Sequence, residues 1–541
     1  MSSLDEFRPP DGAYFALFFF RPVKRKISRP VRRPAALDER AAPGDGEGVR
    51  FTTGGDSIYH AGGMTKVGMV SLGCPKNLVD SEVMLGLLVR EGFALTTEAA
   101  EADILIVNTC AFIDPAKMES IETILEMARW KAHGRCRKLI VTGCLAERYR
   151  EHLQRELPEV DALVGTREIE RIVEVCRDGE RGTTTRSRRR LPILPLALAS
   201  RYVEDAARPR VLATPPFSAY LKIAEGCDHT CSFCIIPTLR GPFRSRPLES
   251  LLREAEALAA RGVRELILIA QDTTHYGADL GMKEGLAALL RALARIEGIR
   301  WIRFLYGYPN HVSEAVIEAV ASEEKVCAYF DIPFQHASAR LLRLMRRGGT
   351  RRSFERLVER IRRRIPDATL RTTFIIGFPG ETERDFRELL DFCRTVEFDY
   401  AGAFLYSDEE GTAAFGLTAK VSREVARERL RRFQREQARI ASRRSRRWIG
   451  RTVEVLVEGS VEGEASDRRP RASPRPPLLR GRMAGQAPEI DGRVILDPGD
   501  GVESALEPRL PQPGEFVSVE IVDAIGCDLI GRVCAPGEAS R

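Results

Sequence analysis

Six of the twelve cysteines in this chain form two groups of three whose placement suits metal chemistry. One group occupies the loop CDHTCSFC with C-x3-C-x2-C spacing, and each member of the other follows an apolar run: the groups are Cys227, Cys231 and Cys234, and Cys74, Cys110 and Cys144. Three thiolates can hold a cubane iron–sulfur cluster and leave one iron without a protein ligand. Two such sites predict an enzyme that makes a radical at one cluster and uses it near the other.

Other chemistry fits the C-x3-C-x2-C loop less well. Structural zinc prefers four ligands, usually in paired C-x2-C knuckles, and no Cys or His follows Cys234 at that spacing. A catalytic Cys–His pair needs one thiolate rather than three, so we interpret His229, inside the loop, as a surface residue or a support for the ligands. For the second group the competing interpretation is three unrelated buried thiols, because free cysteine is commonly a core residue.

The composition favours a multi-domain protein outside the membrane. The chain has 541 residues, 43% of them hydrophobic and 30% charged, which allows two or three cores. No apolar run approaches the roughly 18 residues of a membrane span, and the N-terminus lacks the basic region and cleavage site of a signal peptide. Cysteines without an export signal predict a reducing, cytoplasmic location, where ligand roles are commoner than disulfides.

Two stretches differ from the rest of the chain. Residues 1–63 are rich in Pro, Gly and Arg without a sustained period, which predicts a disordered extension. At Met64 the text changes to the strand-like MTKVGMVSLGC, and we expect Met64 to be the natural start. Residues 178–212 carry RSRRR and several prolines, which is typical of a linker.

Residues 66–177 alternate apolar strands with helical runs. The strands read VGMVSL, DILIVN, LIVTG and ALVG, and the helices are expected near 78–91, 116–132 and 147–156. This order predicts a parallel sheet with helices on its faces. In such sheets ligands bind beyond the carboxyl ends of the strands. The second group of cysteines follows the first three strands directly, so we expect these thiols to converge in space.

Residues 213–448 repeat the pattern six times and predict an open, partial (β/α)6 barrel without obvious antiparallel hairpins. The strands read AYLKIAE, ELILIAQD, WIRFLYGY, AYFDIPF, RTTFIIG and YAGAFLY, with helices near 248–261, 283–296 and 353–365. Functional groups of such barrels lie at the C-terminal strand ends. Polar residues at strand ends could contact a ligand or cap helices: Gln271, Asp272, Gln335 and His336. Gly377, Phe378, Pro379 and Gly380 follow a strand, where glycine permits close approach to a ligand or a plain turn.

The C-terminal part combines a basic helix with an acidic barrel. Residues 421–448 contain eleven Arg and three Glu, which is typical of a solvated face or an RNA contact. Residues 449–535 contain short strands with Gly and Pro turns, which predicts a small antiparallel β-barrel interrupted by a loop at 459–480. Residues 449–541 contain eleven Arg and no Lys against sixteen Asp and Glu, a net charge of −5.

The cysteine loop on the first strand of a partial barrel resembles the radical SAM superfamily. The span from Lys66 to about Val533 resembles its methylthiotransferase family, through VSLGCPKNLVDSE, VNTCAFI, TGCLAERY, CDHTCSFC, DIPFQHAS and FIIGFPGET, followed by a barrel that resembles a TRAM domain. These motifs are long and occur in the family's order. The resemblance therefore covers nearly all of the chain after residue 65.

The resemblance implies roles for both groups of cysteines. Cys227, Cys231 and Cys234 would hold the 4Fe–4S cluster that binds S-adenosyl-L-methionine and cleaves it reductively to a radical. Cys74, Cys110 and Cys144 would hold a second 4Fe–4S cluster that carries the sulfur to be transferred. Gly377–Gly380, Gln271 and Gln335 would lie near S-adenosylmethionine. An electron donor of the flavodoxin or ferredoxin type is also implied.

Members of this family modify either tRNA adenosine or an aspartate of ribosomal protein uS12. CPKNLVDSE, the extended loop IAEGCDHTCSFCIIPTLRGPFRSR, APEIDG and DLIG resemble the RimO type, which acts on the protein. The acidic barrel gives an independent argument, because phosphate binding depends on Lys and Arg, whereas an acidic surface complements a basic ribosomal protein. The basic helix could still reach ribosomal RNA. From another class, a non-enzymatic iron–sulfur or RNA-binding protein stays open, although three ligands per site are rare where a cluster is structural.

Overall fold

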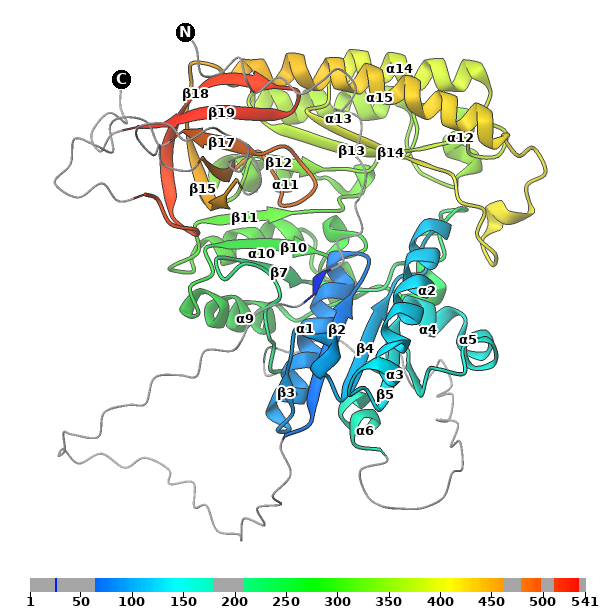
Figure 1. Cartoon of the computed structure of the whole chain (residues 1–541). Coiled ribbons are helices and arrows are strands. Elements are labelled where there is room, and N and C mark those ends of the chain that lie inside the picture. The colour runs from blue at the N-terminus through cyan, green and yellow to red at the C-terminus, as the bar shows by residue number, and fades with distance from the viewer. Residues whose placement is uncertain are drawn as a thin grey trace, which may run out of the picture.

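The computed structural model describes residues 25–26, 64–178, 206, 208–461, 478–497 and 510–534. These residues form an N-terminal sheet, a central unit of six parallel strands and a C-terminal closed barrel (Figure 1). The predicted disordered extension and linker fall mostly outside the described residues, as does most of the predicted loop 459–480. Within the described residues, no helix is both long enough and apolar enough to cross a membrane.

The N-terminal sheet is parallel, as its apolar strands predict. Its neighbours run β2 (Lys66–Ser71), β4 (Ile104–Thr109), β5 (Lys138–Gly143) and β6 (Ala162–Val164), while β3 (Ala94–Leu95) pairs in parallel with β2 and β1 (Arg25–Lys26) pairs antiparallel with it. The helices are α1 (Pro75–Arg90), α2 (Asp114–Ala128), α3 (Trp130–His133), α4 (Cys144–Arg148), α5 (Arg150–Glu156) and α6 (Ile172–Arg177). Alternate residues of β4 enter separate hydrophobic clusters on the two faces, so the sheet is buried on both sides.

The central unit consists of two three-stranded parallel sheets placed edge to edge. Their orders are β11 (Trp301–Phe304), β10 (Glu265–Ile269), β7 (Ser218–Lys222), and β12 (Tyr329–Asp331), β13 (Thr369–Ile376), β14 (Tyr400–Leu405). A bridge between Ile302 and Val326 connects them beside β11 and β12. One short antiparallel pair, β8 (Ala224–Glu225) with β9 (Arg244–Ser245), lies outside the strand–helix repeat. It forms because the cysteine loop leaves and returns beside itself.

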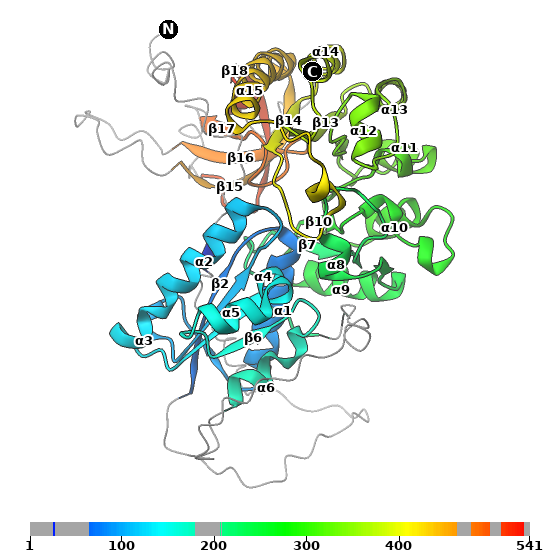
Figure 2. The ribbon, with the colours of Figure 1, turned by 90° about the vertical axis from the view of Figure 1, so that its right-hand side faces the viewer.

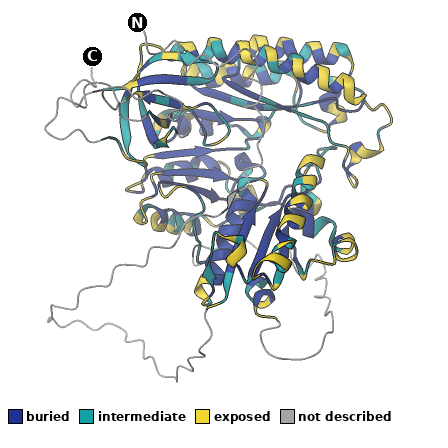
Figure 3. Cartoon of the chain, viewed as in Figure 1, coloured by how far each residue is buried: buried dark blue, intermediate teal, exposed yellow. Residues whose placement is uncertain are grey.

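Helices cover the outside of this open barrel (Figure 2). They are α9 (Leu248–Ala260), α10 (Gly285–Ala294), α11 (Glu314–Ser322), α12 (Ala339–Leu344), α13 (Arg351–Arg364), α14 (Glu383–Val396) and α15 (Arg423–Ser445). The short α8 (Ile236–Arg240) instead packs through Leu239 into a hydrophobic cluster of the N-terminal sheet. Reciprocal side-chain caps from Thr350 and Thr382 start α13 and α14, as expected for capping boxes. The strands are buried, whereas the outer helix faces are exposed (Figure 3).

The C-terminal barrel closes in the order β15 (Thr452–Ser460), β16 (Leu479–Met483), β17 (Val494–Asp497), β19 (Asp528–Val533), β18 (Phe516–Ile525). The expected antiparallel pairing holds for all neighbours but one, since β17 and β19 are parallel. The chain leaves β17 by a long connection and re-enters at β18. The tight turn from β18 to β19 then returns the chain in the direction of β17.

One hydrophobic cluster joins all three parts. Inward-facing residues of the central strands, such as Ile267 and Tyr329, pack against Leu78 and Val79 of α1 and against Leu456 of the C-terminal barrel. Helix α1 therefore fills the open side of the central unit. This contact brings the first turn of α1, with its cysteine, close to the C-terminal strand ends of the other sheet.

Candidate active site: two cysteine triads and a buried polar network

The N-terminal triad forms where three parallel strands end side by side. Cys74 is the N-cap of α1, Cys110 follows β4, and Cys144 begins α4 directly after β5. The register pairs Thr109 with Gly143, which aligns the ends of β4 and β5. The three thiols lie close enough to influence one another's ionisation. The three cysteines therefore lie close together in the structure, as their positions after the strands predict.

Two glycines allow this convergence. Gly73 has φ +84°, and a Cβ there would lie 2.7 Å from Cys110 Cβ. Gly143 has φ +92°, and a Cβ would lie 2.3 Å from Asn108 Oδ1 and 2.5 Å from the Thr109 carbonyl oxygen. Positive φ and the missing Cβ both require glycine. The backbone therefore reaches the triad at Cys74 and at Cys144 because a glycine precedes each of these cysteines.

Four of the six thiols are held in an environment that favours protonation before metal binds. Burial raises the pKa of Cys144 to about 11, that of Cys227 to about 11 and that of Cys234 to about 12. Burial also raises the pKa of Cys110. Metal ligation by thiolates therefore has to release protons.

The C-x3-C-x2-C loop is anchored by its backbone and by one arginine. The Cys227 amide donates to the Gly241 carbonyl (3.0 Å), and the Ser232 amide donates to the Met345 carbonyl (2.9 Å). Arg347 Nη1 donates to Cys231 Sγ at 3.7 Å, and its guanidinium lies 4.0 Å from the centroid of the Tyr308 ring. The loop is thereby fixed to the segments that follow β11 and α12.

The ligand geometry bears on the choice between one metal ion and a cluster. Among the described residues, the group whose ligand atoms all lie within 4.8 Å of one another is His229, Asp272 and His311. Neither cysteine triad is that compact. A single tetrahedral zinc ion needs its ligand atoms close together, so the wider triads fit a larger iron–sulfur cluster better.

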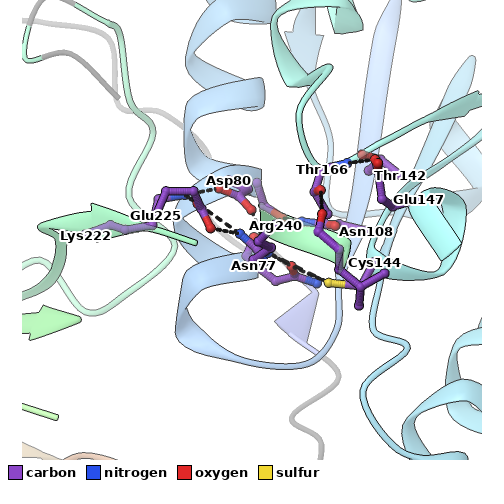
Figure 4. Close-up of polar contacts among 12 residues, drawn as sticks. Asn77, Asp80, Asn108, Thr142, Cys144, Glu147, Thr166, Lys222, Glu225 and Arg240 are labelled. Carbon is purple, nitrogen blue, oxygen red and sulfur yellow. Dashed lines mark hydrogen bonds and ion pairs between the residues drawn. The ribbon is translucent and has the colours of Figure 1, made fainter. Parts of the chain in front are cut away.

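A buried polar network runs from residues on either side of the cysteine loop to the N-terminal triad (Figure 4). Arg240, from α8 beyond the cysteine loop, donates through Nη2 to Asn77 Oδ1 (2.6 Å) and Asp80 Oδ2 (3.1 Å), and through Nη1 to both Glu225 oxygens (3.1 Å each). The same Nη2 lies 3.9 Å from Cys144 Sγ. Arg240 is 2% exposed. One side chain of the central unit thus contacts a thiol of the N-terminal triad.

The charges in this network are balanced. Lys222 Nζ pairs with Asp80 and donates to Glu225 Oε2 (2.8 Å), so two cations face two carboxylates. Burial alone would raise the pKa of Glu225, but the charges of Arg240 and Lys222 hold it well below its usual range. Burial opposes the charge of Arg240, yet Glu225 and Asp80 raise its pKa. Every charge here has a partner, which buried ion pairs require.

Asn77 adds a second link inside the N-terminal sheet. Its amide nitrogen donates to the carbonyls of Leu72 (3.2 Å) and Thr109 (2.8 Å), which lie at the ends of β2 and β4. Its oxygen accepts from Arg240 and lies 3.8 Å from Cys144 Sγ. The first turn of α1 therefore organises the backbone around the triad as well as supplying Cys74.

A buried lysine lies where α1 meets the central unit. Lys76 is 8% exposed, and its Nζ lies 3.4 Å from the centroid of the Tyr306 ring. Burial lowers the pKa of Lys76, partly offset by Cys74. Tyr306 follows β11 and adopts φ +64°, a conformation that costs free energy in residues other than glycine and is common at functional sites.

His229 supports the cysteine loop rather than extending the ligand set. His229 Nε2 and His311 Nδ1 lie 2.7 and 2.8 Å from Asp272 Oδ2, and the His229 ring stacks on Tyr308 with centroids 4.0 Å apart. Burial would raise the pKa of Asp272, but hydrogen bonds from His229, His311 and Thr274 lower it. Asp272 also accepts from the Thr274 amide (3.0 Å). This is the capping role that the sequence left open.

The other polar residues at strand ends lie at the same end of the central unit. Gln271 Nε2 donates to Glu225 Oε1 (2.9 Å), while its own buried oxygen has no hydrogen-bond partner among the described residues. Gln335 adopts φ +71°. His336 is fully buried, accepts from the Ser338 amide (3.0 Å) through Nδ1, and leaves Nε2 without a hydrogen bond in the described chain. The unsatisfied oxygen of Gln271 suits a ligand that donates a hydrogen bond.

The stretch Gly377–Gly380 forms a packed turn after β13. Gly377 has φ +79°, and a Cβ there would lie 2.7 Å from Ala426 Cβ in α15. Phe378 is fully buried in a small cluster with Leu341, and Phe233 of the cysteine loop packs against that cluster. The packing explains the glycine on structural grounds. It also connects this turn to the cysteine loop.

The sequence reasoning missed Arg240, Glu225, Lys76 and Tyr306. Lys76 lies within the motif CPKNLVDSE, and Arg240 lies in the segment after the cysteine loop. Both motifs indicated the family, but they did not indicate a role for these two side chains. Charged residues within otherwise buried elements were the available signal, because such residues are seldom buried unless paired.

Comparisons with known proteins agree with this architecture. Residues 66–165 match the uncharacterized protein family UPF0004, residues 221–393 match the radical SAM superfamily, and residues 449–534 match the TRAM domain. A relative named ribosomal protein uS12 methylthiotransferase RimO from Solibacter usitatus is 48% identical, covering 87% of this chain and 96% of its own length. Proteins of the same name from Pelotomaculum thermopropionicum (48% identical, 86% and 99% covered) and Symbiobacterium thermophilum (47%, 90% and 95%) are similar. The chain belongs to the RimO family of radical SAM methylthiotransferases.

Proposed function

We propose that this chain transfers a methylthio group to the β-carbon of an aspartate in ribosomal protein uS12. The observation that carries the proposal is that one buried network, centred on Arg240, contacts a thiol of the N-terminal triad and starts from the segment that follows the other triad. Both triads therefore border one region at the C-terminal ends of two sets of parallel strands. Group transfer between two cofactors requires such an arrangement.

In this proposal each triad holds one 4Fe–4S cluster. Cys227, Cys231 and Cys234 hold the cluster that binds S-adenosylmethionine, and Cys74, Cys110 and Cys144 hold the other. When bound, these groups would supply the reductive cleavage of S-adenosylmethionine to a radical and the sulfur that is transferred. The chain itself buries the thiols of Cys110, Cys144 and Cys227 away from water. Asn77 and Arg240 orient the N-terminal triad, and Arg347 orients the loop triad.

The region for S-adenosylmethionine is assigned to the strand ends beside the C-x3-C-x2-C loop. Gln271 offers an unsatisfied buried oxygen there, and Gln335 has a backbone conformation typical of functional sites. The Gly377–Gly380 turn, with Phe378 and Pro379, packs behind the loop. We assign the domains as 66–177, 213–448 and 449–535, with 178–212 as the linker.

The charge of the C-terminal barrel supports the protein substrate over tRNA. Residues 449–541 carry a net charge of −5, which complements a basic ribosomal protein and opposes a phosphate backbone. The arginines of α15 are partly neutralised, since Arg432, Arg443 and Arg444 pair with Glu383, Glu397 and Asp399 of the central unit. Contact of α15 with ribosomal RNA is consequently a weaker expectation. We expect the enzyme to act in the cytoplasm with a flavodoxin- or ferredoxin-like electron donor.

The proposal is tested by mass spectrometry of uS12 and of bulk tRNA from cells with and without this gene. We expect the methylthio group on one aspartate of uS12 to disappear without the gene, and tRNA to be unchanged. Loss of methylthio-adenosine from tRNA instead would establish the second candidate, a tRNA methylthiotransferase. If the reduced, cluster-loaded protein does not cleave S-adenosylmethionine, a structural iron–sulfur protein becomes the better assignment.

A further inference from the structure

Lys76 is a buried lysine whose amine has no carboxylate beside it among the described residues. Its side chain belongs to a residue that is 8% exposed, and no carboxylate in the described chain lies within ion-pair distance of its Nζ. Its contact is the face of the Tyr306 ring, 3.4 Å from the ring centroid. The face of an aromatic ring attracts a cation, but it carries no net negative charge and does not replace an ion pair.

The carboxylates nearest to Lys76 are already engaged. Glu225 accepts from Arg240, Lys222 and Gln271. Asp331 pairs with Arg371 at 2.7 Å and accepts from the Tyr306 amide at 2.9 Å. Elsewhere in this region each buried cation has a partner of its own. Lys76 lacks such a partner among the described residues, and a bound anion would supply the missing counter-charge.

Lys76 also lies where a substrate would have to be placed. It follows Cys74 by two residues in the first turn of α1, and it contacts a residue at the C-terminal end of β11 in the central unit. Tyr306 is held in a left-handed conformation by hydrogen bonding to Asp331. The lysine is therefore held where the helix that bears Cys74 meets the C-terminal strand ends of the central unit.

Resting on the proposed function, we propose that Lys76 and Tyr306 form a carboxylate-binding site that recognises the side chain of the substrate aspartate. The carbon to be modified is the one that bears this carboxylate. An ion pair with Lys76 would hold the carboxylate, and the carbon to be modified is only one covalent bond away from that group. The carbon would thus be placed within the region that both triads border. It also rejects a neutral side chain, because the lysine would stay buried and unpaired.

Two other negatively charged groups could lie beside Lys76, and the experiment separates them. One is the carboxylate of S-adenosylmethionine, and the other is the negative charge of a cluster at Cys74. Cluster-loaded wild-type protein, Lys76→Met and the matched control Lys283→Met, at an exposed lysine, are compared in three assays. These are methylthiolation of uS12, cleavage of S-adenosylmethionine without uS12, and the electron paramagnetic resonance spectra and midpoint potentials of both reduced clusters.

We expect Lys76→Met to lower kcat/KM for uS12 by about 100-fold or more, as for the loss of one partner of a buried charge pair. Cleavage of S-adenosylmethionine and both cluster signals should match those of Lys283→Met. With uS12 carrying asparagine at the modified position, wild type should lose most of its kcat/KM, whereas Lys76→Met should discriminate little between the two side chains. That loss of discrimination identifies the aspartate as the occupant.

Several results would overturn the inference. Impaired cleavage without uS12 would assign the site to S-adenosylmethionine, and a shifted potential of the N-terminal cluster would make Lys76 its counter-charge. Unchanged kcat/KM would remove any role. A wild-type protein that cleaves S-adenosylmethionine but leaves uS12 unmodified would refute the proposed function itself, which no variant of Lys76 can do.

A second pair of variants guards against misfolding of Lys76→Met. Tyr306→Phe keeps the ring beneath the lysine and should retain the preference for aspartate. Tyr306→Leu removes the ring and should raise KM for uS12 while S-adenosylmethionine cleavage is retained. Equal behaviour of the two Tyr306 variants in the uS12 assay would contradict the site.

Discussion

The two cysteine triads are built in opposite ways. The C-x3-C-x2-C triad comes from one loop, so its spacing alone brings the three thiols together, and distant residues such as Met345 and Arg347 anchor that loop. The N-terminal triad is assembled from three strand ends that are aligned by sheet register and two glycines. The comparison teaches that equal ligand sets can differ in vulnerability: the first depends on local geometry, and the second depends on the whole N-terminal sheet.

The largest expected effects come from the cysteines themselves. Cys231→Ala should abolish cleavage of S-adenosylmethionine, because the cluster that binds it loses a ligand. Cys110→Ala should leave cleavage detectable but stop methylthiolation of uS12. Product analysis of both reactions checks this division of labour. Methylthiolation at the wild-type rate in Cys110→Ala would remove the second cluster from the assignment.

A change of backbone should break only the triad that depends on the sheet. Gly143→Val places a side chain against the Thr109 backbone at a positive φ, so the ends of β4 and β5 must separate. We expect loss of the N-terminal cluster, with retention of the other and of S-adenosylmethionine cleavage. Iron content and paramagnetic resonance measure both. Gly416→Ala, where a Cβ meets nothing within 4 Å, is the control that should keep both clusters.

Arg240 tests whether the triads are coupled through the network. Arg240→Met leaves Glu225 and Asp80 with one cation fewer, and removing one partner of a buried ion pair costs about 3–5 kcal/mol. Denaturant unfolding of the metal-free protein should show this loss. Arg431→Met on the exposed face of α15 should change stability by less than about 0.5 kcal/mol. Equal stability of the two variants would contradict the network's role.

Asp272 tests the local triad with a smaller effect. Asp272→Ala removes the acceptor shared by His229, His311 and Thr274, and leaving such groups unsatisfied costs about 1–3 kcal/mol. The cluster at the C-x3-C-x2-C loop should become more labile to chelator, while the N-terminal cluster should not. Equal release of both clusters would show that the loop does not depend on this acceptor.

The smallest effect is a pH dependence shared by both triads. The pKa of Cys144 is about 11 in the folded chain against 9.0 for an ordinary thiol, so the unfolded state ionises first as pH rises. The free energy of unfolding of the metal-free protein should therefore fall as pH increases from about 9 to about 11. Below about pH 9 this thiol should cause no change of stability with pH. Cys144→Ala should show a shallower decline. If the melting temperature of Cys144→Ala falls with pH as steeply as that of the unaltered protein, this thiol is not the source of the pH dependence.

Both cysteine groups and the architecture could be predicted from the sequence, because their signals are periodic or local. Apolar runs such as DILIVN give the parallel strands, and cysteines placed directly after strands must meet at one edge of the sheet. The contact of Arg240 with Asn77 could not be predicted in this way. It depends on how α1 packs into another unit of the chain, and no periodicity records that. The parallel pairing of β17 with β19 was hidden for the same reason, since it depends on a long connection.

Helix α1 has one further consequence. It bears Cys74 at its N-terminus, while Leu78 and Val79, one turn on, are core residues of the central unit and of the C-terminal barrel. The separation between the two cysteine triads is therefore set by close-packed side chains, which resist compression and transmit strain. A mutation deep in this core, far from any thiol, would alter the reaction by changing that separation, and would resemble a catalytic defect in a protein that still folds.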